Sequence, residues 1–161
     1  MIGARRMWEA FLVAEILIRQ SRLEDLGELT EIFRDASLSN AEDRENLLAH
    51  PEFLVLNDTA IVDGNLRVAE IDGLTVGFAT GAPAGRDVVL EDLFVHPDWM
   101  RKGVATRLVA DLVDRSRAAG AIRVAVTANP HASAFYEAAG FRGTEEVTTE
   151  FGPGTRMHLQ L

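Results

Sequence analysis

A short basic loop between two apolar segments is the part of the sequence best suited to bind a ligand. It reads V-H-P-D-W-M-R-K-G-V-A-T-R-L from Val95 to Leu108, with Arg101, Lys102 and Gly103 at its centre. A strand pattern precedes it and an amphipathic helix pattern follows it. The first helical turn has unpartnered N–H groups and the positive end of the helix dipole, which suit a phosphate or pyrophosphate. Many strand–turn–helix connections contain Gly and Lys for geometric reasons alone, so the loop by itself leaves both interpretations open.

Composition excludes several other kinds of chemistry. The 161 residues include 47% hydrophobic and 25% charged residues, which is typical of one soluble globular domain. A formal net charge of −9 argues against nucleic acid as a partner and favours a cationic substrate. The absence of cysteine excludes disulfides and a cysteine nucleophile, and the four histidines lack metal-ligand spacing, so we expect no metal.

The N-terminal residues 1–14 read as an extension before a single domain that spans residues 15–161. An apolar run over Met1 to Ile18 superficially suggests a signal peptide. Glu9 and Glu15 interrupt this run, and it is too short to span a bilayer. We therefore expect a cytoplasmic protein without a membrane partner.

The hydrophobic periodicity must position the loop within a layered fold. It predicts a strand, two helices, three strands, a helix, a strand, a helix and two strands. The strands are expected at residues 15–20, 66–71, 74–80, 87–95, 121–127, 145–151 and 155–161, with turns at 72–73 and 152–154, a loop at 81–86, and 53–65 unassigned. Helices packed on a mixed sheet make this an α/β or α+β fold.

Two segments together resemble the GCN5-related N-acetyltransferase (GNAT) superfamily. The first is L-E-D-L-F-V-H-P-D-W-M-R-K-G-V-A-T-R-L, from Leu90 to Leu108, which is similar to the family's acetyl-CoA motif of a strand followed by (Gln/Arg)-x-x-Gly-x-(Gly/Ala). The second is N-P-H-A-S-A-F-Y-E-A-A-G-F, from Asn129 to Phe141. The resemblance implies a mixed, mostly antiparallel sheet flanked by helices. One departure is Met100, which stands at the Gln/Arg position.

The resemblance also implies a site for acetyl-CoA as cosubstrate. Backbone N–H groups of the basic loop would hold the pyrophosphate, and the strand before it would meet the pantetheine arm. Asn129 would contact the same arm, although its ability to cap the following helix explains it equally well. The residues implied in cofactor binding are Leu93, Phe94, Val95, Arg101, Lys102, Gly103, Val104, Ala105, Thr106, Asn129 and Tyr136.

Acetyl transfer to an amine needs a base for the ammonium proton and an acid for the leaving thiolate. Tyr136 is the only tyrosine, and the family uses the tyrosine at this motif position as the acid. Glu91 is the candidate base: in a regular strand it would share a face with Leu93 and Val95, where desolvation would raise its pKa. A solvated strand end explains Glu91 equally well. Asp92 is a candidate anchor for a substrate ammonium or a structural carboxylate.

The acceptor is expected to be a primary amine of a small cationic molecule or a peptide. In this superfamily the acceptor pocket comes from segments that correspond here to Ser21 to Glu52 and Glu145 to Thr155, both rich in acidic residues. These acids would also suit two solvated helices. A competing interpretation is a non-catalytic acyl-CoA-binding module, which Met100 favours. Many members of the superfamily are homodimers, so a homodimer is an open possibility.

Overall fold

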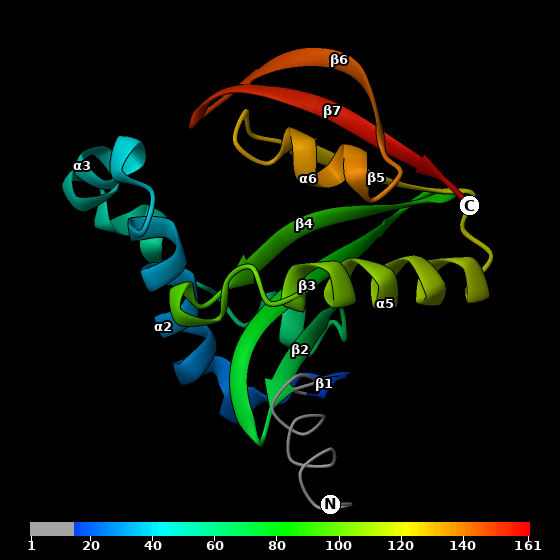
Figure 1. Cartoon of the computed structure of the whole chain (residues 1–161). Helices are drawn as coiled ribbons and strands as arrows, with labels where there is room; N and C mark the ends of the chain where they lie inside the picture. The colour runs from blue at the N-terminus through cyan, green and yellow to red at the C-terminus, as the bar shows by residue number, and fades with distance from the viewer. Residues whose placement is uncertain (1–14) are drawn as a thin grey trace, which may run out of the picture.

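The computed structural model describes residues 15–161, so the predicted N-terminal extension lies outside the described residues. The predicted order of elements is confirmed, with one short helix added in the segment that the sequence left unassigned (Figure 1). The strands are β1 (Ile16–Gln20), β2 (Leu66–Ile71), β3 (Leu74–Ala84), β4 (Asp87–Val95), β5 (Arg123–Ala128), β6 (Arg142–Thr149) and β7 (Gly152–Gln160). The α-helices are α2 (Leu26–Leu38), α3 (Ala41–Ala49), α4 (Thr59–Val62), α5 (Val104–Ala118) and α6 (Ser133–Ala138), with 3-10 turns η1 (Leu23–Asp25), η2 (Pro51–Leu54) and η3 (Pro97–Trp99).

The seven strands of the described residues form one sheet in the order β1-β2-β3-β4-β5-β7-β6. Every neighbouring pair is antiparallel except β4 and β5, which run parallel and are connected through α5. The predicted Asp72-Gly73 turn joins β2 to β3, and both residues have the positive φ that a type I′ hairpin requires. The mixed, mostly antiparallel sheet expected from the sequence is therefore confirmed.

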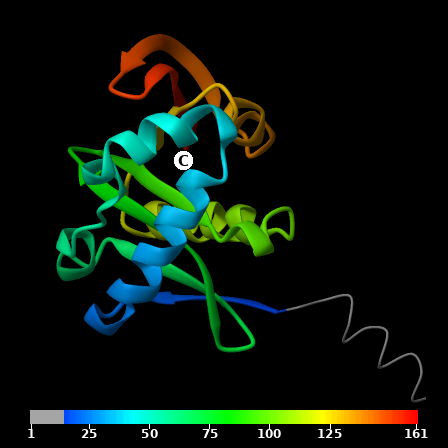
Figure 2. The same ribbon diagram turned by 90° about the vertical axis from the view of Figure 1, so that its left-hand side faces the viewer.

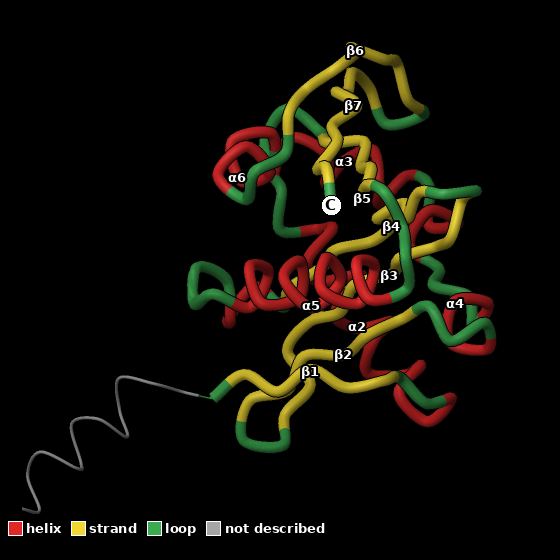
Figure 3. Tube along the Cα trace, turned by 90° about the vertical axis from the view of Figure 1, so that its right-hand side faces the viewer, coloured by secondary structure: helices red, strands yellow, loops and turns green. Residues whose placement is uncertain are grey.

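Two hydrophobic clusters hold helices on opposite faces of the sheet (Figures 2 and 3). Helix α5 buries Val104, Leu108 and Leu112, and the helical spacing of these residues places them on one stripe. Helix α6 joins the same cluster through Tyr136. Helix α2 packs on the other face with Leu29 and Ile32, against Val68, Phe78 and other residues of β2 and β3.

Some predicted boundaries are wrong where glycine and proline lie inside strands. β3 extends through the predicted loop to Ala84, and Pro83 pairs with Val88 of β4. β2 begins at Leu66, opposite Thr80, so beyond Thr80 this edge of β3 has no partner strand among residues 15–161, and proline is tolerated there. The Gly152–Gly154 segment, predicted as a turn, belongs to β7. Among residues 15–161, no helix combines the length and apolar character needed to cross a membrane.

Candidate active site

The two parallel strands in the middle of the sheet separate partway along their length. β4 pairs with β5 from Asp87 opposite Arg123 to Leu90 opposite Val126, and the pairing ends there. Beyond this point β4 continues against β3, and β5 continues against β7. Among the strands of residues 15–161, none pairs with the other edge of β4 at its carboxyl end.

The free edge of β4 presents backbone groups of Leu93 and Val95. The His96 N–H donates to the Val76 carbonyl at 2.8 Å, and Phe94 and Asp92 lie two and four residues earlier on β4. Alternate residues of an antiparallel ladder direct both backbone groups to the partner strand, so these three face β3. Leu93 and Val95 therefore turn their N–H and C=O groups toward the opening. An extended ligand could add there as a strand would.

A β-bulge interrupts β4 where it leaves β5. Asp92 pairs with Thr80, but Leu90 pairs with Gly81, so Glu91 is an extra residue without a partner on β3. Leu90 consequently lies in the same cluster as Val95, on the face that α5 covers. The regular alternation expected along β4 is thus wrong at Glu91, which is exposed instead of lying among apolar neighbours.

Asp92, not Glu91, is the partly buried carboxylate of the bulge. Asp92 is half-buried, and burial raises the pKa of its carboxyl, while contact with the Thr80 hydroxyl lowers that pKa. Thr80 lies directly opposite on β3 and is 1% exposed. Two adjacent carboxylates therefore lie at the strand separation, one open to water and one partly withdrawn from it.

The basic loop ends in a set of unpaired backbone donors. Arg101 and Gly103 have φ of 60° and 86°, which turns the chain into α5. The first hydrogen bond of α5 runs from the Arg107 N–H to the Gly103 carbonyl at 3.0 Å, and no side chain in the described part of the chain caps the helix. Within residues 15–161, no backbone bond of a turn or cap uses the N–H groups of residues 101–106. Such a run of free N–H groups at a helix start suits an anion.

The side chains of the basic loop differ in their exposure to solvent. Arg101 and Lys102 are exposed, and the Lys102 ammonium lies 5.1 Å from the centre of the Trp99 ring. Val104 is buried, Ala105 is partly buried and Thr106 is exposed. Met100, at the departure from the motif, is 41% exposed and belongs to no buried cluster of the described residues.

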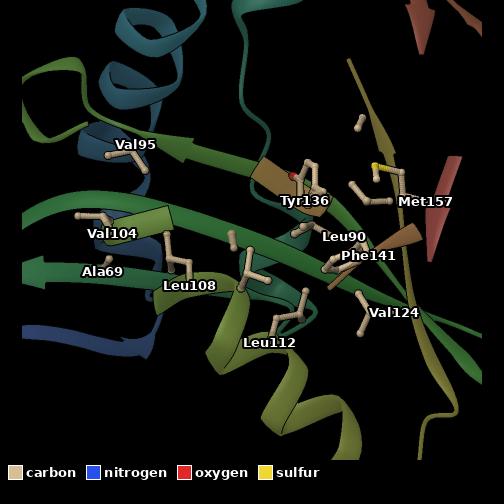
Figure 4. Close-up of a cluster of buried hydrophobic side chains, with 14 of the residues drawn as sticks. Ala69, Leu90, Val95, Val104, Leu108, Leu112, Val124, Tyr136, Phe141 and Met157 are labelled. Carbon is tan, nitrogen blue, oxygen red and sulfur yellow. The ribbon is translucent and has the colours of Figure 1, made fainter. Parts of the chain in front are cut away.

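Tyr136 lies on α6 within the larger hydrophobic cluster, beside Leu90 and Phe141 (Figure 4). Its ring meets Phe135 and Phe141 edge-on, with ring centroids 5.1 and 5.4 Å away. The side chain is 6% exposed, and burial raises the pKa of the phenol to about 12. The phenol of the free protein therefore remains protonated throughout the neutral range and can donate its proton there.

Asn129 organises the turn between β5 and α6. Its side-chain oxygen accepts a hydrogen bond from the Ala132 N–H at 2.9 Å. The turn delays the helix, which begins at Ser133 instead of at Pro130, the start expected if Asn129 capped it directly. The amide N–H₂ of Asn129 is exposed and remains able to donate to a ligand.

The β6–β7 hairpin, which is part of one segment expected to line the acceptor pocket, contacts the residue directly after the other segment, Ser21 to Glu52. Phe53 of η2 and Phe151, at the turn between β6 and β7, make an edge-on contact with centroids 5.4 Å apart. Glu42 of α3 lies 3.0 Å from His131 in the turn before α6. A cleft of about 480 Å³ opens between the start of α6 and the β6–β7 hairpin, with Glu146 on its wall. η2 thus contacts the hairpin, and α3 contacts the turn before α6.

Sequence patterns did not single out Thr80 or the Phe53–Phe151 contact. Thr80 becomes visible only once the bulge sets the register between β3 and β4. Phe53 fell in the segment that was left unassigned, and Phe151 was placed inside a strand. A signal was present only for Phe151, as an aromatic residue next to a predicted turn.

Comparison with solved structures shows the same fold in several acetyltransferases. The PaiA N-acetyltransferase from Thermoplasma acidophilum, solved in complex with coenzyme A, is 19% identical with a TM-score of 0.73 and matches 91% of this chain and 99% of its own. A GCN5-related N-acetyltransferase from Rhodopseudomonas palustris is 24% identical, with a TM-score of 0.74 and coverage of 92% and 98%. YncA from Salmonella typhimurium, a putative acetyltransferase with its cofactor acetyl-CoA, is 25% identical, with a TM-score of 0.66 and coverage of 91% and 94%.

A search of curated proteins gives no match. The family model of the acetyltransferase (GNAT) domain matches residues 58–161, which is well over half of the chain and includes both sequence motifs. The matched region also contains the separating strands, the free edge of β4 and the start of α5. The chain therefore belongs to the GNAT family of acetyltransferases.

Proposed function

We propose that this protein is an acetyl-CoA-dependent N-acetyltransferase that acts on a primary amine of a small cationic molecule or a peptide. The observation that supports this most strongly is the separation of β4 from β5 between a helix start with free N–H groups and a buried tyrosine. Membership of the GNAT family and the coenzyme A complexes among its structural neighbours agree with acetyl-CoA as cosubstrate.

Different residues along the opening would bind the different parts of acetyl-CoA. The free N–H groups of residues 101–106 would hold the pyrophosphate, helped by the Thr106 hydroxyl. The backbone groups of Leu93 and Val95, with Phe94 between them and the Asn129 amide opposite, would hold the pantetheine arm. Acetyl-CoA supplies an activated acetyl group as a thioester. Because backbone groups carry the phosphate site, Met100 removes only a side-chain contribution.

The two carboxylates of the bulge would prepare the amine. An alkylammonium has no lone pair, so it must lose a proton before it can attack. Asp92 would bind the ammonium at the partly buried side of the bulge, and Glu91 would accept its proton through one water. The exposure of Glu91 gives that proton a route to solvent.

Tyr136 would complete the proton balance. As the nitrogen–carbon bond forms and the carbon–sulfur bond breaks, the phenol would give its proton to the departing thiolate. The phenolate would then take the second proton of the new amide nitrogen. The products are an N-acetylated amine, a thiol and the proton that Glu91 released.

Acidic residues around the acceptor side support a cationic acceptor. Glu45 and Glu146 are exposed there, and Glu146 lies on the wall of the cleft beside α6. Other acids of this region have side-chain partners, since Glu42 contacts the His131 ring and Glu145 lies 3.5 Å from the Arg156 guanidinium. The negative charge of Glu145 is therefore partly compensated, and the preference for a cation would rest mainly on Asp92, Glu45 and Glu146.

Thiol release from acetyl-CoA with a panel of amines tests the proposal. The panel should contain polyamines, aminoglycosides, basic peptides and neutral amino acids. We expect turnover with a cationic member, a severe loss of kcat in Glu91→Gln, and no effect of Glu137→Gln, which alters an exposed carboxylate of α6. Tight coenzyme A binding without turnover of any amine would support the acyl-CoA-binding module instead. Turnover of neutral amino acids alone would refute the cationic acceptor.

A further inference from the structure

A buried hydroxyl lies against the half-buried carboxylate of the bulge. Thr80 of β3 and Asp92 of β4 are direct partners across the ladder, at the last pair before the register shifts. Thr80 is 1% exposed, and its hydroxyl has no hydrogen bond of good geometry to any of residues 15–161. This hydroxyl is therefore an unpaired polar group in an otherwise apolar part of the sheet.

Packing alone does not explain a threonine at this position. Valine has nearly the same shape, favours strands equally and buries no hydroxyl. Leu66 pairs with Thr80 from β2, and Phe78 lies two residues before Thr80 on β3. Both belong to the apolar cluster under α2. An unsatisfied buried hydroxyl is costly, so its persistence points to a polar group that uses it. The Asp92 carboxyl is the polar group that faces it.

The hydroxyl and burial act on Asp92 in opposite directions. Burial raises the pKa of Asp92 and the contact with Thr80 lowers it, and no charged group in the described part of the chain contributes. A hydroxyl that donates to a carboxylate stabilises the ionised form and fixes its orientation. Contacts of this kind are often loose in a free enzyme and tighten when the substrate is present.

We propose that Thr80 is a positioning residue that holds the Asp92 carboxylate ionised and directed toward the incoming substrate ammonium. The inference rests on the proposed function, because it names how the amine is held. Thr80 would donate its hydroxyl from the β3 side, and the ammonium would donate from the side of the opening. The bulge makes this arrangement possible, since it places the pair where β4 leaves β5.

The test compares Thr80→Val, which removes only the hydroxyl, with Thr80→Ser, which keeps it. Thr75→Val serves as the matched control, because Thr75 lies on the same strand opposite Glu70 and away from Asp92. Titration of the Asp92 carboxyl carbon by NMR should give a higher midpoint in Thr80→Val than in the parent. Thr80→Ser and Thr75→Val should keep the parent midpoint. Thermal unfolding of each variant checks that the fold is intact.

Kinetics with the amine found by the panel add a second measurement. For Thr80→Val we expect KM for the amine to rise about tenfold, with kcat and KM for acetyl-CoA within about twofold of the parent. Thr80→Ser should restore the low KM. An unchanged Asp92 midpoint in Thr80→Val, or an equal effect of Thr75→Val, would overturn the inference. A parent without turnover would refute the proposed function alone, because the NMR titration needs no activity.

Discussion

The single tyrosine of the chain allows its protonation to be measured directly. Tyr136 is the only residue whose ultraviolet absorbance changes through phenol ionisation, since the chain has no second tyrosine. Burial among Leu90, Phe135 and Phe141 raises the pKa of the phenol from 10.0 to about 12. We therefore expect a tyrosinate titration with a midpoint near 12 in the folded protein and near its ordinary value in denaturant.

The raised pKa of Tyr136 also predicts how the unfolding free energy changes with pH. The raised pKa means that the folded state disfavours the phenolate, so the stability that Tyr136 contributes is complete below the unfolded pKa of 10. It is lost as the pH rises through the folded pKa of about 12. A difference of two pKa units corresponds to about 3 kcal/mol of unfolding free energy. Urea unfolding across this range should therefore show a loss in the parent that is absent in Tyr136→Phe.

Tyr136→Phe also separates packing from chemistry. Phenylalanine fills the same space, so its stability at neutral pH should stay within about 1 kcal/mol of the parent. If the phenol protonates the thiolate, kcat should fall by about 10² or more. A tyrosinate midpoint near 10 in the folded protein would refute the burial argument. An unchanged kcat would refute the role as acid, whatever the titration shows.

Two further perturbations test the loop and the support of the first strand. Gly103→Ala should weaken coenzyme A binding about tenfold, as measured by calorimetry, because a φ of 86° strains any residue with a Cβ. The control Gly27→Ala adds a Cβ in open space on α2 and should leave binding unchanged. Asp25→Asn should lower the unfolding free energy by about 1–2 kcal/mol at neutral pH, because it removes a paired carboxylate with two hydrogen bonds from Arg19. The hydrogen bond from Arg19 lowers the pKa of Asp25 in the folded state. The stability difference between the parent and Asp25→Asn should therefore persist above the unfolded-state pKa of Asp25 and vanish as the pH falls through its folded-state pKa. An equal stability difference in strong acid would contradict this reasoning.

The order of elements could be predicted because each element carries its own local pattern. The apolar stripe of α5, with Val104, Leu108 and Leu112, repeats at helical spacing and needs no tertiary information. The Asp72-Gly73 turn likewise specifies a hairpin through two residues that tolerate positive φ. The predicted strand boundaries were wrong near Pro83 and Gly154. Whether a strand tolerates these residues depends on which strand lies beside it, and the neighbouring strand cannot be inferred from a single sequence.

The surroundings of the candidate site residues were predicted correctly where local backbone geometry determines them and incorrectly where strand register does. A glycine before a helix pattern is enough to predict the free N–H groups at the start of α5, and the structure has them. The faces of Glu91 and Asp92 were derived from strict alternation along β4, which one extra residue in the strand invalidates. That extra residue is defined only by its lack of a partner on β3, so no pattern within β4 could reveal it.

The bulge at Glu91 connects the shape of the sheet with the proposed chemistry. A bulge bends its strand and increases the local twist, and here it lies directly after the last pair between β4 and β5. The bend thus accounts for the opening that leaves Leu93 and Val95 with free backbone groups. The same extra residue exposes Glu91 and keeps Asp92 opposite the buried Thr80. A single irregularity in β4 therefore sets both the place where a thioester could lie and the different surroundings of the two carboxylates that would serve the amine.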